Sequence, residues 1–283
     1  MKKILITGEN SYIGTSVEKW LNRYPNKYFI NTISVRGDSW KQKDFSGYDT
    51  VLHVAGIAHI RETKKNALLY YKVNRDLTIE IAKKAKKDGI EHFIFLSTMS
   101  VYGLETGVIN EYTPLKPNSH YGRSKLQAEK AIKKLEDNNF KIAIIRPPMV
   151  YGKGCKGNYK KLSKFARITP VFPEINNKRS MIYIDNLSEY IRYIIDNKLS
   201  GIFLPQNKEY VNTTYLVQLI AKQHGKKIKP TKIFNPLILL LKSNSLIKKV
   251  FGNLVYDFNI PSNQTFEKIN IISLEESIKL TEK

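Results

Sequence analysis

The chain begins with a short apolar strand that runs directly into a glycine-bearing turn and then into a helix. Apolar residues fill most of 3–6, the turn reads Thr7-Gly8-Glu9-Asn10-Ser11-Tyr12-Ile13-Gly14, and a helical pattern covers 11–24. A strand, a tight glycine turn and a helix in immediate succession are typical of the first half of a βαβ unit, which builds a parallel sheet. No other feature of the sequence constrains the fold as strongly.

Further apolar runs alternate with helical patterns along the first half of the chain. We expect strands over 3–6, 28–35, 50–54, 92–96 and 141–145, each buried on both faces, and helices over 11–24, 67–88 and 121–137. Alternation of this kind is typical of βαβ units with helices on both faces of the sheet. The sequence therefore predicts an α/β fold, a doubly wound parallel sheet of the Rossmann type.

The pattern weakens after Pro147-Pro148, where glycines and prolines cluster as far as Pro173. Such a change in composition is typical of a boundary between compact regions. We predict a larger domain over 1–152, which also takes in 178–204, and a smaller C-terminal lobe over 153–177 and 205–283.

The chain is basic, with 47 Lys and Arg residues against 25 Asp and Glu residues and a formal net charge of +22. This charge would suit nucleic acid, an anionic membrane or a polyphosphate ligand. However, the lysines of 82–87 have the spacing of a solvated helix face, and no aromatic-interleaved basic motif or zinc spacing accompanies them. We therefore expect no nucleic-acid partner.

Two apolar segments bear on location. The run near the N-terminus is shorter than the ~7 to 15 residues of a signal-peptide core, and 237–241 is far below the ~20 residues that span a bilayer. We expect a cytoplasmic protein without stable membrane insertion. The segment 236–242, followed by Lys248-Lys249, would suit either a membrane surface or a buried wall of the smaller lobe, and we favour the buried wall.

Cysteine and histidine give little sign of further chemistry. Cys155 is the single cysteine, so it has no partner for an internal disulfide, and we expect an unreactive thiol. His53 and His59 fall near the expected ligand side of the sheet, where a lone histidine is usually a structural residue. No His, Cys or carboxylate cluster has the spacing of a metal site.

The glycine turn predicts a cradle for a diphosphate at the start of the first helix, formed by Gly8, Ser11, Tyr12, Ile13 and Gly14. Gly8 permits the tight turn, and Gly14 lets the helix pack closely on the strand. Ser11 stands where a G-x-x-G-x-x-G pattern has its middle glycine. Its hydroxyl would either donate to a phosphate or crowd it, and both readings stay open.

The expected second strand ends Ser34-Val35-Arg36-Gly37. Dinucleotide folds that prefer NAD usually present an acidic residue to the ribose hydroxyls at this point. A guanidinium pairs instead with a 2′-phosphate, so Arg36 favours NADP(H) over NAD(H). NAD(H) stays an alternative for two reasons. Asp38 is close enough to meet the ribose hydroxyls, and the Arg36 side chain could be solvated without contacting the cofactor.

Tyr121 and Lys125 are four residues apart within a predicted helix, which places both on one face. An ammonium near a phenol favours the phenolate and makes its proton easier to transfer. The pair therefore indicates redox chemistry at a carbonyl or carbinol carbon.

Together these residues make the chain resemble an extended short-chain dehydrogenase/reductase of the nucleotide-sugar epimerase/dehydratase family, over nearly its whole length. The motifs that carry the resemblance, besides the turn and the Tyr-Lys pair, are Leu52-His53-Val54-Ala55-Gly56, Val73-Asn74, Ser97-Thr98-Met99-Ser100-Val101-Tyr102-Gly103, Arg146-Pro147-Pro148-Met149-Val150-Tyr151-Gly152, residues 179–185 and Ser273-Leu274-Glu275-Glu276-Ser277-Ile278.

The resemblance implies roles for particular residues and for the two parts of the chain. Thr98 would hold the sugar carbonyl oxygen, Tyr121 would transfer the proton, and Lys125 would lower the pKa of Tyr121 and hold the nicotinamide ribose, with Ser97 as the alternative to Thr98. The larger domain would bind the dinucleotide and the smaller lobe a UDP-sugar. The further cofactor contacts that it implies are Val54, Ala55, Gly56 and Asn74, and the substrate contacts are Thr98, Asn158 and Arg179, the last as a diphosphate clamp. Family members often form homodimers through two helices of the larger domain.

The resemblance also narrows the reaction. Nucleotide-sugar 4,6-dehydratases carry two acids after the active-site threonine, whereas this chain has Met99-Ser100, so dehydration is not expected. An NAD-dependent 4-epimerase and an NADPH-dependent C4 ketoreductase remain, with a non-catalytic dinucleotide-binding scaffold as a third reading. Arg36 and a finer resemblance to bacterial capsule and O-antigen reductases of UDP-4-keto-6-deoxy-N-acetylhexosamines favour the ketoreductase.

Overall fold

The computed structural model describes residues 1–58, 60, 62–241, 243–260, 269 and 272–283. The chain forms two compact units. Unit 1 comprises Met1–Gly103, Leu115–Pro147 and Leu187–Pro205, and unit 2 comprises Leu104–Pro114, Pro148–Asn186 and Gln206–Lys283.

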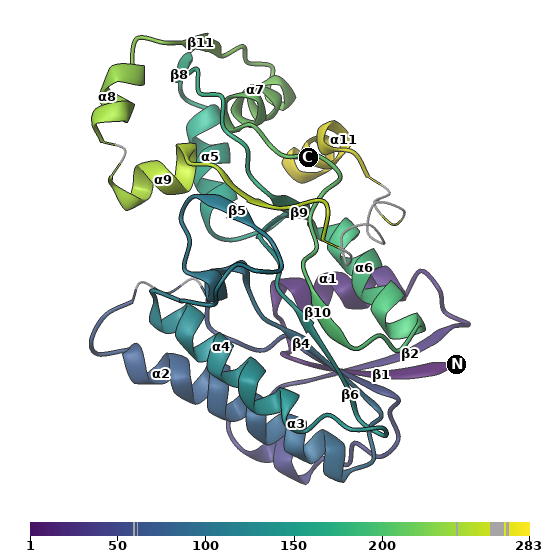
Figure 1. Ribbon diagram of the computed structural model, residues 1–283. Helices are drawn as coiled ribbons and strands as arrows, with labels where there is room; N and C mark the ends of the chain where they lie inside the picture. The colour runs from purple at the N-terminus through teal and green to yellow at the C-terminus, as the bar shows by residue number, and fades with distance from the viewer. Residues whose placement is uncertain (59, 61, 242, 261–268, 270–271) are drawn as a thin grey trace. The chain divides into compact units, whose positions relative to one another are not determined.

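Unit 1 contains a six-stranded sheet in the order β10-β6-β4-β3-β1-β2, in which every neighbouring pair is parallel (Figure 1). Its strands are β1 (Lys2–Thr7), β2 (Tyr28–Ile33), β3 (Thr50–His53), β4 (His92–Leu96), β6 (Lys141–Ile145) and β10 (Gly201–Phe203). The chain moves from β1 to one side for β2 and to the other for β3, so the order reverses between β1 and β3. Ligands of open α/β sheets bind at such a switch point.

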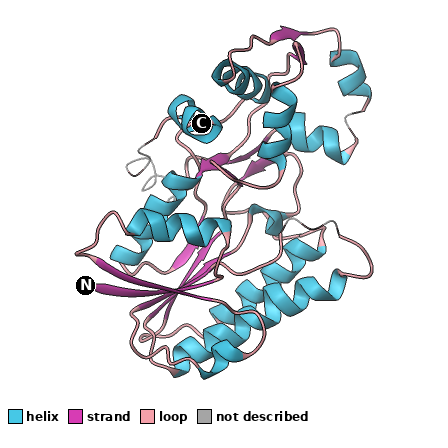
Figure 2. Cartoon of the chain, turned by 180° about the vertical axis from the view of Figure 1, so that it is seen from behind, coloured by secondary structure: helices cyan, strands magenta, loops and turns pink. Residues whose placement is uncertain are grey.

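Helices cover both faces of this sheet. Figure 1 shows α1 and α6 on one face and α2, α3 and α4 on the other, and Figure 2 shows the same layers from behind. Their bounds are α1 (Tyr12–Leu21), α2 (Ala67–Tyr71), α3 (Leu77–Lys87), α4 (His120–Lys133) and α6 (Ile184–Asp196), with 3₁₀ turns η1 (Ser39–Gln42) and η3 (Met99–Tyr102). The predicted doubly wound α/β fold is confirmed.

The main core lies between the sheet and α3 and α4. Its residues include Val51, Phe93, Phe95, Ile142 and Ile144 from the strands and Ile81, Ala85, Ala128 and Ile132 from the helices. Both faces of β3 and β4 are buried, as expected. The same expectation is wrong for β2, where Phe29 is 48% exposed, because β2 lies at the edge of the sheet.

The segment predicted as one helix over 67–88 is not regular. A π-helical turn, η2 (Lys72–Asp76), separates α2 from α3. A π turn inserts one residue into a helix and is frequent at functional sites.

Unit 2 contains three two-stranded parallel sheets, β5–β12, β7–β9 and β8–β11. Its strands are β5 (Gly107–Ile109), β7 (Met149–Tyr151), β8 (Val171–Pro173), β9 (Met181–Tyr183), β11 (Lys229–Thr231) and β12 (Leu254–Tyr256), and its helices are α5 (Asn158–Ala166), α7 (Thr213–Gln223), α8 (Asn235–Leu240), α9 (Ser245–Phe251) and α11 (Leu274–Glu282). The predicted bounds put 104–114, 148–152 and 178–186 in the larger domain, whereas here they belong to unit 2, because β5, β7 and β9 pair within it.

A buried carboxylate joins three helices of unit 2. Glu282 of α11 accepts hydrogen bonds from Tyr159 (2.8 Å) and Ser163 (2.9 Å) of α5 and lies 2.7 Å from Nε2 of His224, which follows α7. A buried carboxylate is tolerated where donors surround it in this way. The contact fixes the C-terminal helix on α5 and α7.

The expectation that 236–242 forms a buried wall is wrong for the part of this segment that the structure describes. None of the residues of α8 is buried, and Leu240 is 78% exposed. When a short helix is apolar on all sides, packing against a single neighbouring element covers only one side and leaves the others exposed. Within the described ranges, no helix combines the length and the apolar composition needed to cross a membrane.

Candidate functional site

The glycine turn lies at the switch point, directly against the end of β3. Gly8 has φ of 122°, and a Cβ atom there would lie 2.8 Å from the amide nitrogen of Ala55. At Gly14, a Cβ atom would lie 3.0 Å from Cγ2 of Val54. Both positions therefore require glycine, and Val54 and Ala55 form the wall opposite the start of α1.

Ser11 has a role that the sequence left open. It is the N-cap of α1, and its Oγ accepts a hydrogen bond from the amide of Gly14 at 3.1 Å. Its hydroxyl is thus turned back onto the first helical turn, where Tyr12 and Ile13 also lie. The N-terminus of a helix, with its N–H groups and positive dipole end, attracts phosphate. This cradle fits a dinucleotide diphosphate.

The end of β2 lies beside the same turn, because the carbonyl of Ile33 accepts a hydrogen bond from Gly8 N at 3.0 Å. Arg36 follows three residues later and is exposed. Asp38 forms an exposed ion pair with Lys41 at 2.9 Å. The guanidinium rather than an unpaired carboxylate is therefore presented at this edge of the site.

Asn74 braces the loop after β3 from within the π turn. It is fully buried, its Oδ1 accepts from Ile57 N at 2.8 Å, and its Nδ2 donates to Ile57 O at 3.0 Å and to Ser124 Oγ at 3.3 Å. A Cβ atom at Gly56 would lie 2.9 Å from Asn74 Oδ1 and 3.2 Å from Lys125 Nζ. Asn74 thus holds the Gly56–Ile57 backbone against α4.

Tyr121 lies in the first turn of α4 and faces Thr98, which follows β4. The amides of His120 and Tyr121 donate to the Glu62 carboxylate at 3.0 and 2.9 Å, which anchors this end of the helix. The Thr98 hydroxyl donates to Ser100 Oγ at 3.2 Å. Burial raises the pKa of Tyr121, and the nearby Thr98 hydroxyl opposes this increase in part. Thr98 Oγ1 also accepts from Ser100 N at 3.1 Å.

Lys125 lies one turn further along α4 and is 4% exposed. Its Nζ donates to Leu96 O at 2.8 Å and lies 4.6 Å from the centre of the Phe95 ring. Burial lowers the pKa of Lys125 to about 7, against the opposing charge of Glu129. The Lys125 amine donates to Leu96 O, and the groups that shift the pKa of Tyr121 here are its burial and Thr98, so the expected effect of Lys125 on that pKa stays a prediction.

A buried polar network beneath Lys125 was missed in the sequence analysis. Arg146 donates to both carboxylate oxygens of Glu129, at 3.1 and 2.6 Å, and to Tyr102 OH at 2.9 Å, and Ser97 Oγ donates to the same carboxylate. The network links α4 to the ends of β4 and β6 and to η3. Glu129 stands four residues after Lys125 on the same helix face, a spacing that was available as a signal.

The other residues considered from sequence are structural or lie elsewhere. His53 Nδ1 lies 2.6 Å from Thr7 Oγ1 and its Nε2 3.0 Å from Thr78 Oγ1, and burial lowers its pKa to about 3. His59 lies outside the described residues. Burial raises the pKa of the Cys155 thiol, which is therefore protonated at neutral pH. Among the described residues, no group of three or more His, Cys, Asp or Glu side chains is placed to hold a metal ion.

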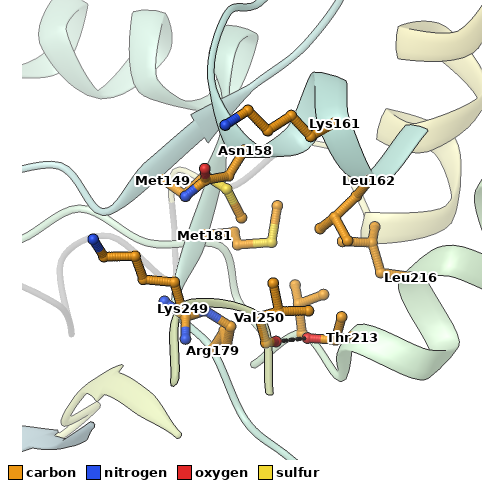
Figure 3. A pocket seen from close by; sticks show the side chains of 11 residues that line it. Met149, Asn158, Lys161, Leu162, Arg179, Met181, Thr213, Leu216, Lys249 and Val250 are labelled. Atoms are coloured by element: carbon orange, nitrogen blue, oxygen red, sulfur yellow. Dashed lines mark hydrogen bonds between the residues drawn. The ribbon is translucent and has the colours of Figure 1, made fainter. Parts of the chain in front are cut away.

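Unit 2 contains a cavity of about 170 Å³ that brings Asn158 and Arg179 together (Figure 3). The side chains of Met149, Leu162, Met181, Val211, Leu216 and Val250 supply an apolar lining, and Thr213, Lys161 and Lys249 complete it. Lys161 was not expected at a site from the sequence, and Lys249 was considered only as a neighbour of the apolar segment 236–242. Thr98, Tyr121, Lys125 and the turn belong to unit 1, so the predicted residues fall into two groups.

Arg179 is held in this cavity by backbone carbonyls. Its Nη1 donates to Lys248 O at 3.2 Å and to Gly252 O at 3.0 Å, while its Nε is buried without a hydrogen-bond partner in the described structure. Burial lowers the pKa of Arg179. A guanidinium with a buried N–H to spare, near Lys249, has the charge and the donor that an anionic ligand requires.

A model of the NAD dependent epimerase/dehydratase family matches residues 4–203. The chain belongs to this family. Among the relatives of this epimerase/dehydratase family member, UDP-glucose 4-epimerase of Vibrio cholerae is 32% identical over 251 residues, which cover 78% of this chain and 75% of the relative. N-acetyl-alpha-D-glucosaminyl-diphospho-ditrans,octacis-undecaprenol 4-epimerase of Escherichia coli O157:H7 is 29% identical over 257 residues, which cover 84% of this chain and 77% of the relative.

Solved structures share the fold of this family member. UDP-glucuronic acid 4-epimerase from Bacillus cereus in complex with NAD has a TM-score of 0.76 at 20% identity and covers 98% of this chain and 96% of its own. RMD from Pseudomonas aeruginosa complexed with NADPH has a TM-score of 0.77 at 16% identity, covering 99% of this chain and 98% of its own.

Proposed function

We propose that the protein is an NADPH-dependent C4 ketoreductase that acts on a UDP-4-keto-6-deoxy-N-acetylhexosamine in the synthesis of surface-polysaccharide precursors. The observation that carries the proposal is the placement of the Tyr121 phenol near the Thr98 hydroxyl, on the same helix as the buried amine of Lys125, in a parallel sheet with a switch point. The proposal includes a cytoplasmic homodimer formed through helices of unit 1, one of them α4.

The protonation state of Tyr121 supports reduction. Because burial raises its pKa, the phenol is protonated at neutral pH and is ready to donate a proton. A ketone oxygen gains negative charge as hydride reaches C4, and it takes up that proton. A 4-epimerase uses the same phenol first as proton acceptor and then as donor, so turnover measurements distinguish the two reactions.

Thr98 and Lys125 have separate tasks in this proposal. The Thr98 hydroxyl holds the substrate oxygen beside the phenol and stabilises the charge that develops on it. The Lys125 amine, between Leu96 O and Gly56, lies where it would hold ribose hydroxyls. When bound, the nicotinamide supplies the hydride.

The residues around the turn support a phosphorylated dinucleotide. The start of α1 would receive the diphosphate, with Gly8 and Gly14 allowing close approach. Arg36 would pair with a 2′-phosphate, while the Asp38 carboxylate is already paired with Lys41. These observations favour NADP(H), with NAD(H) as the alternative.

The cavity in unit 2 supports a nucleoside diphosphate group. Arg179, Lys249 and Asn158 would bind the diphosphate, and the methionine and leucine side chains offer an apolar surface to the base. Dehydration finds no support, because Met99 and Ser100 of η3 follow Thr98 where an acid and a base would be needed.

A 4-epimerase is the second candidate, and the names of the two relatives favour it. The Vibrio cholerae relative acts on UDP-glucose, and the Escherichia coli relative acts on a sugar diphosphate linked to undecaprenol. Both substrates share a sugar joined to a diphosphate. The second candidate is therefore an NAD-dependent 4-epimerase of UDP-hexose, UDP-N-acetylhexosamine or the lipid-linked equivalent.

The test is NADPH oxidation upon addition of the 4-keto-6-deoxy product of a UDP-N-acetylglucosamine 4,6-dehydratase, with NADH in parallel. The expected result is stoichiometric oxidation of NADPH. Conversion of UDP-N-acetylglucosamine, UDP-glucose or the undecaprenol-linked sugar to its C4 epimer, without NADPH oxidation, would replace the ketoreductase by the epimerase. Turnover of none of these sugars would favour the non-catalytic scaffold.

The preference for NADPH over NADH can be tested with a variant of Arg36. Arg36→Ser should raise KM for NADPH by about ten- to a hundredfold, the usual value of a charged hydrogen bond, and leave KM for NADH unchanged. Lys43→Ser, at another exposed cation nearby, is the matched control. An equal effect on both cofactors would remove Arg36 from the cofactor site.

A further inference from the structure

The segment around α8 exposes a cluster of large apolar side chains, here called the α8 surface. Its members are Ile233, Phe234, Leu237, Leu239, Leu240 and Leu241, of which Ile233 is 82% and Leu240 78% exposed. Soluble monomers rarely expose contiguous apolar patches of this kind, and such patches usually mark an interaction site.

The neighbouring strands extend the α8 surface. β11 leads into α8 and pairs in parallel with β8, with Lys229 opposite Val171. Val171 and the nearby Ile168 are also exposed. Figure 1 shows α8, drawn in yellow-green, at the margin of unit 2, next to β11 and α9 along the chain.

The charge of this part of the chain is mostly positive, and Glu174 is an exposed acid beside it, since its amide donates to Thr231 O at 2.9 Å and its carbonyl accepts from Asn235 Nδ2 at 3.0 Å. The sequence contains no Asp or Glu between Glu209 and Asp257, whereas the same stretch contains eight lysines, which are Lys222, Lys226, Lys227, Lys229, Lys232, Lys242, Lys248 and Lys249. Glu105 lies 3.9 Å from both Lys248 and Lys249 and partly neutralises them. In the described part of the chain, no ion pair involves Lys229, the first residue of β11, or Lys232, which follows that strand, and both are exposed.

We propose that the α8 surface docks on the surface of an anionic lipid bilayer. A short helix that is apolar on all sides and flanked by lysines is suited to the boundary between lipid headgroups and acyl chains, where the leucines are buried and the lysines meet phosphates. With six residues, α8 lies in this boundary and does not cross the bilayer.

The positive charge of the lysines near α8 favours an anionic bilayer over a second copy of the chain as the partner of the α8 surface. In a symmetric dimer, the same patch faces itself, so the lysines of both copies would be brought together with only Glu105 and Glu174 of each copy as nearby acids. An anionic bilayer instead neutralises them. The uninterrupted apolar run 236–241 also suits a fluid apolar phase better than a protein groove, which selects one face of a helix.

The docking has a consequence for the cavity of unit 2. α9 follows α8 and contributes Lys249 and Val250 to the lining of that cavity. A bilayer under α8 would therefore hold the cavity close to the membrane surface.

The test is co-flotation of the full-length protein with vesicles of equal parts phosphatidylcholine and phosphatidylglycerol, and with vesicles of phosphatidylcholine alone. We expect at least about tenfold more protein on the anionic vesicles, given contributions on the order of fivefold per lysine at the membrane surface. Leu239→Ser/Leu240→Ser should reduce this binding by at least about tenfold. Lys229→Glu/Lys232→Glu should reduce it by at least about twenty-fivefold.

Matched controls lie in unit 1. Leu68→Ser removes an apolar side chain that is 80% exposed, and Lys83→Glu/Lys87→Glu reverses two exposed lysines of α3. Both controls should bind vesicles as the unmodified protein does. Equal binding to both vesicle types, or patch variants that bind like the controls, would overturn the proposal. A dimer that dissociates in the leucine variant during gel filtration, without vesicle binding, would assign the surface to a second copy. The vesicle experiments do not depend on the proposed ketoreductase activity, because NADPH oxidation is measured in solution without vesicles.

Discussion

Tyr121 and Lys125 share a helix face but differ in what they contact. The phenol meets Thr98, whereas the amine meets Leu96 O and the Phe95 ring. With the pKa of Tyr121 raised and that of Lys125 lowered to about 7, burial favours the neutral form of both groups. This protonated phenol suits the proton donor of the proposed reduction.

The proposed role of Tyr121 as the proton donor can be tested by removing its hydroxyl. Tyr121→Phe keeps the ring against Tyr70, 6.4 Å between ring centres, and removes the proton donor. We expect turnover to fall by about 10²- to 10⁴-fold, the usual contribution of general acid catalysis, while dinucleotide affinity measured by fluorescence titration is unchanged.

Tyr112→Phe is the control for this prediction, because Tyr112 is exposed and belongs to unit 2. It should retain full turnover. A Tyr121→Phe variant with most of its rate would show that another group supplies the proton.

Single residues also mark the limit of what the sequence could predict. Gly8 and Gly14 were predictable, because their spacing in a turn after a strand has few physical explanations. The capping role of Ser11 was not predictable. A hydroxyl can accept a hydrogen bond from its own helix or donate one to a ligand, and the sequence spacing of Ser11 in the turn is the same in both cases. The direction of the Lys125 amine likewise depends on the carbonyl of Leu96, a tertiary contact.

Among the secondary-structure elements, α4 depends on the buried pair of Glu129 and Arg146. Glu129→Gln removes the carboxylate charge and leaves Arg146 buried without its counter-charge. We expect the free energy of unfolding in urea to fall by about 3–5 kcal/mol. The variant should also lower the pKa of Lys125 further, because the Glu129 charge raises it.

Glu91→Gln, in the exposed pair with Lys198, is the matched control. Its cost should stay below about 1 kcal/mol. Equal costs for the two variants would mean that the Glu129–Arg146 pair contributes no more than a surface pair.

Secondary-structure elements were predictable where one property of the sequence, such as an apolar run, determines the structure. β4 and β6 were predicted with their observed bounds, because continuous apolar runs of four residues, after His92 and Lys141, form central strands. The π turn was not predictable, since apolar spacings of three and four persist through 67–88 although one residue is inserted near Asn74. The burial of α8 was predicted wrongly because apolar composition indicates burial only where another element covers it.

At the scale of the whole molecule, two buried histidines couple stability to pH. Burial lowers the pKa of His53 to about 3 and of His92 to about 4, from an unfolded value near 6.5. Below pH 6.5 the unfolded chain binds protons that the folded chain does not, so stability falls as the pH falls. Between pH 7 and pH 5, each histidine should cost about 2 kcal/mol of unfolding free energy.

Urea unfolding at both pH values tests this coupling. His92→Gln keeps a donor for Leu199 O, which His92 Nε2 contacts at 2.9 Å, and should remove about half of the histidine contribution. Lys43→Ser, at an exposed position, serves as the control. A variant with the same pH dependence as the unmodified protein would show that His92 is protonated in the folded state.

The chain alternates between its two units, and this has a consequence for synthesis on the ribosome. Unit 1 ends at Pro205 and unit 2 takes residues from 104 to the C-terminus, so neither is continuous in sequence. The sheet lacks its last strand until β10 (Gly201–Phe203) has left the exit tunnel. Until then, β6 is an unprotected edge strand on the nascent chain, and such edges recruit other strands. The protein must therefore spend most of its translation as an incomplete sheet, a period in which chaperone protection matters.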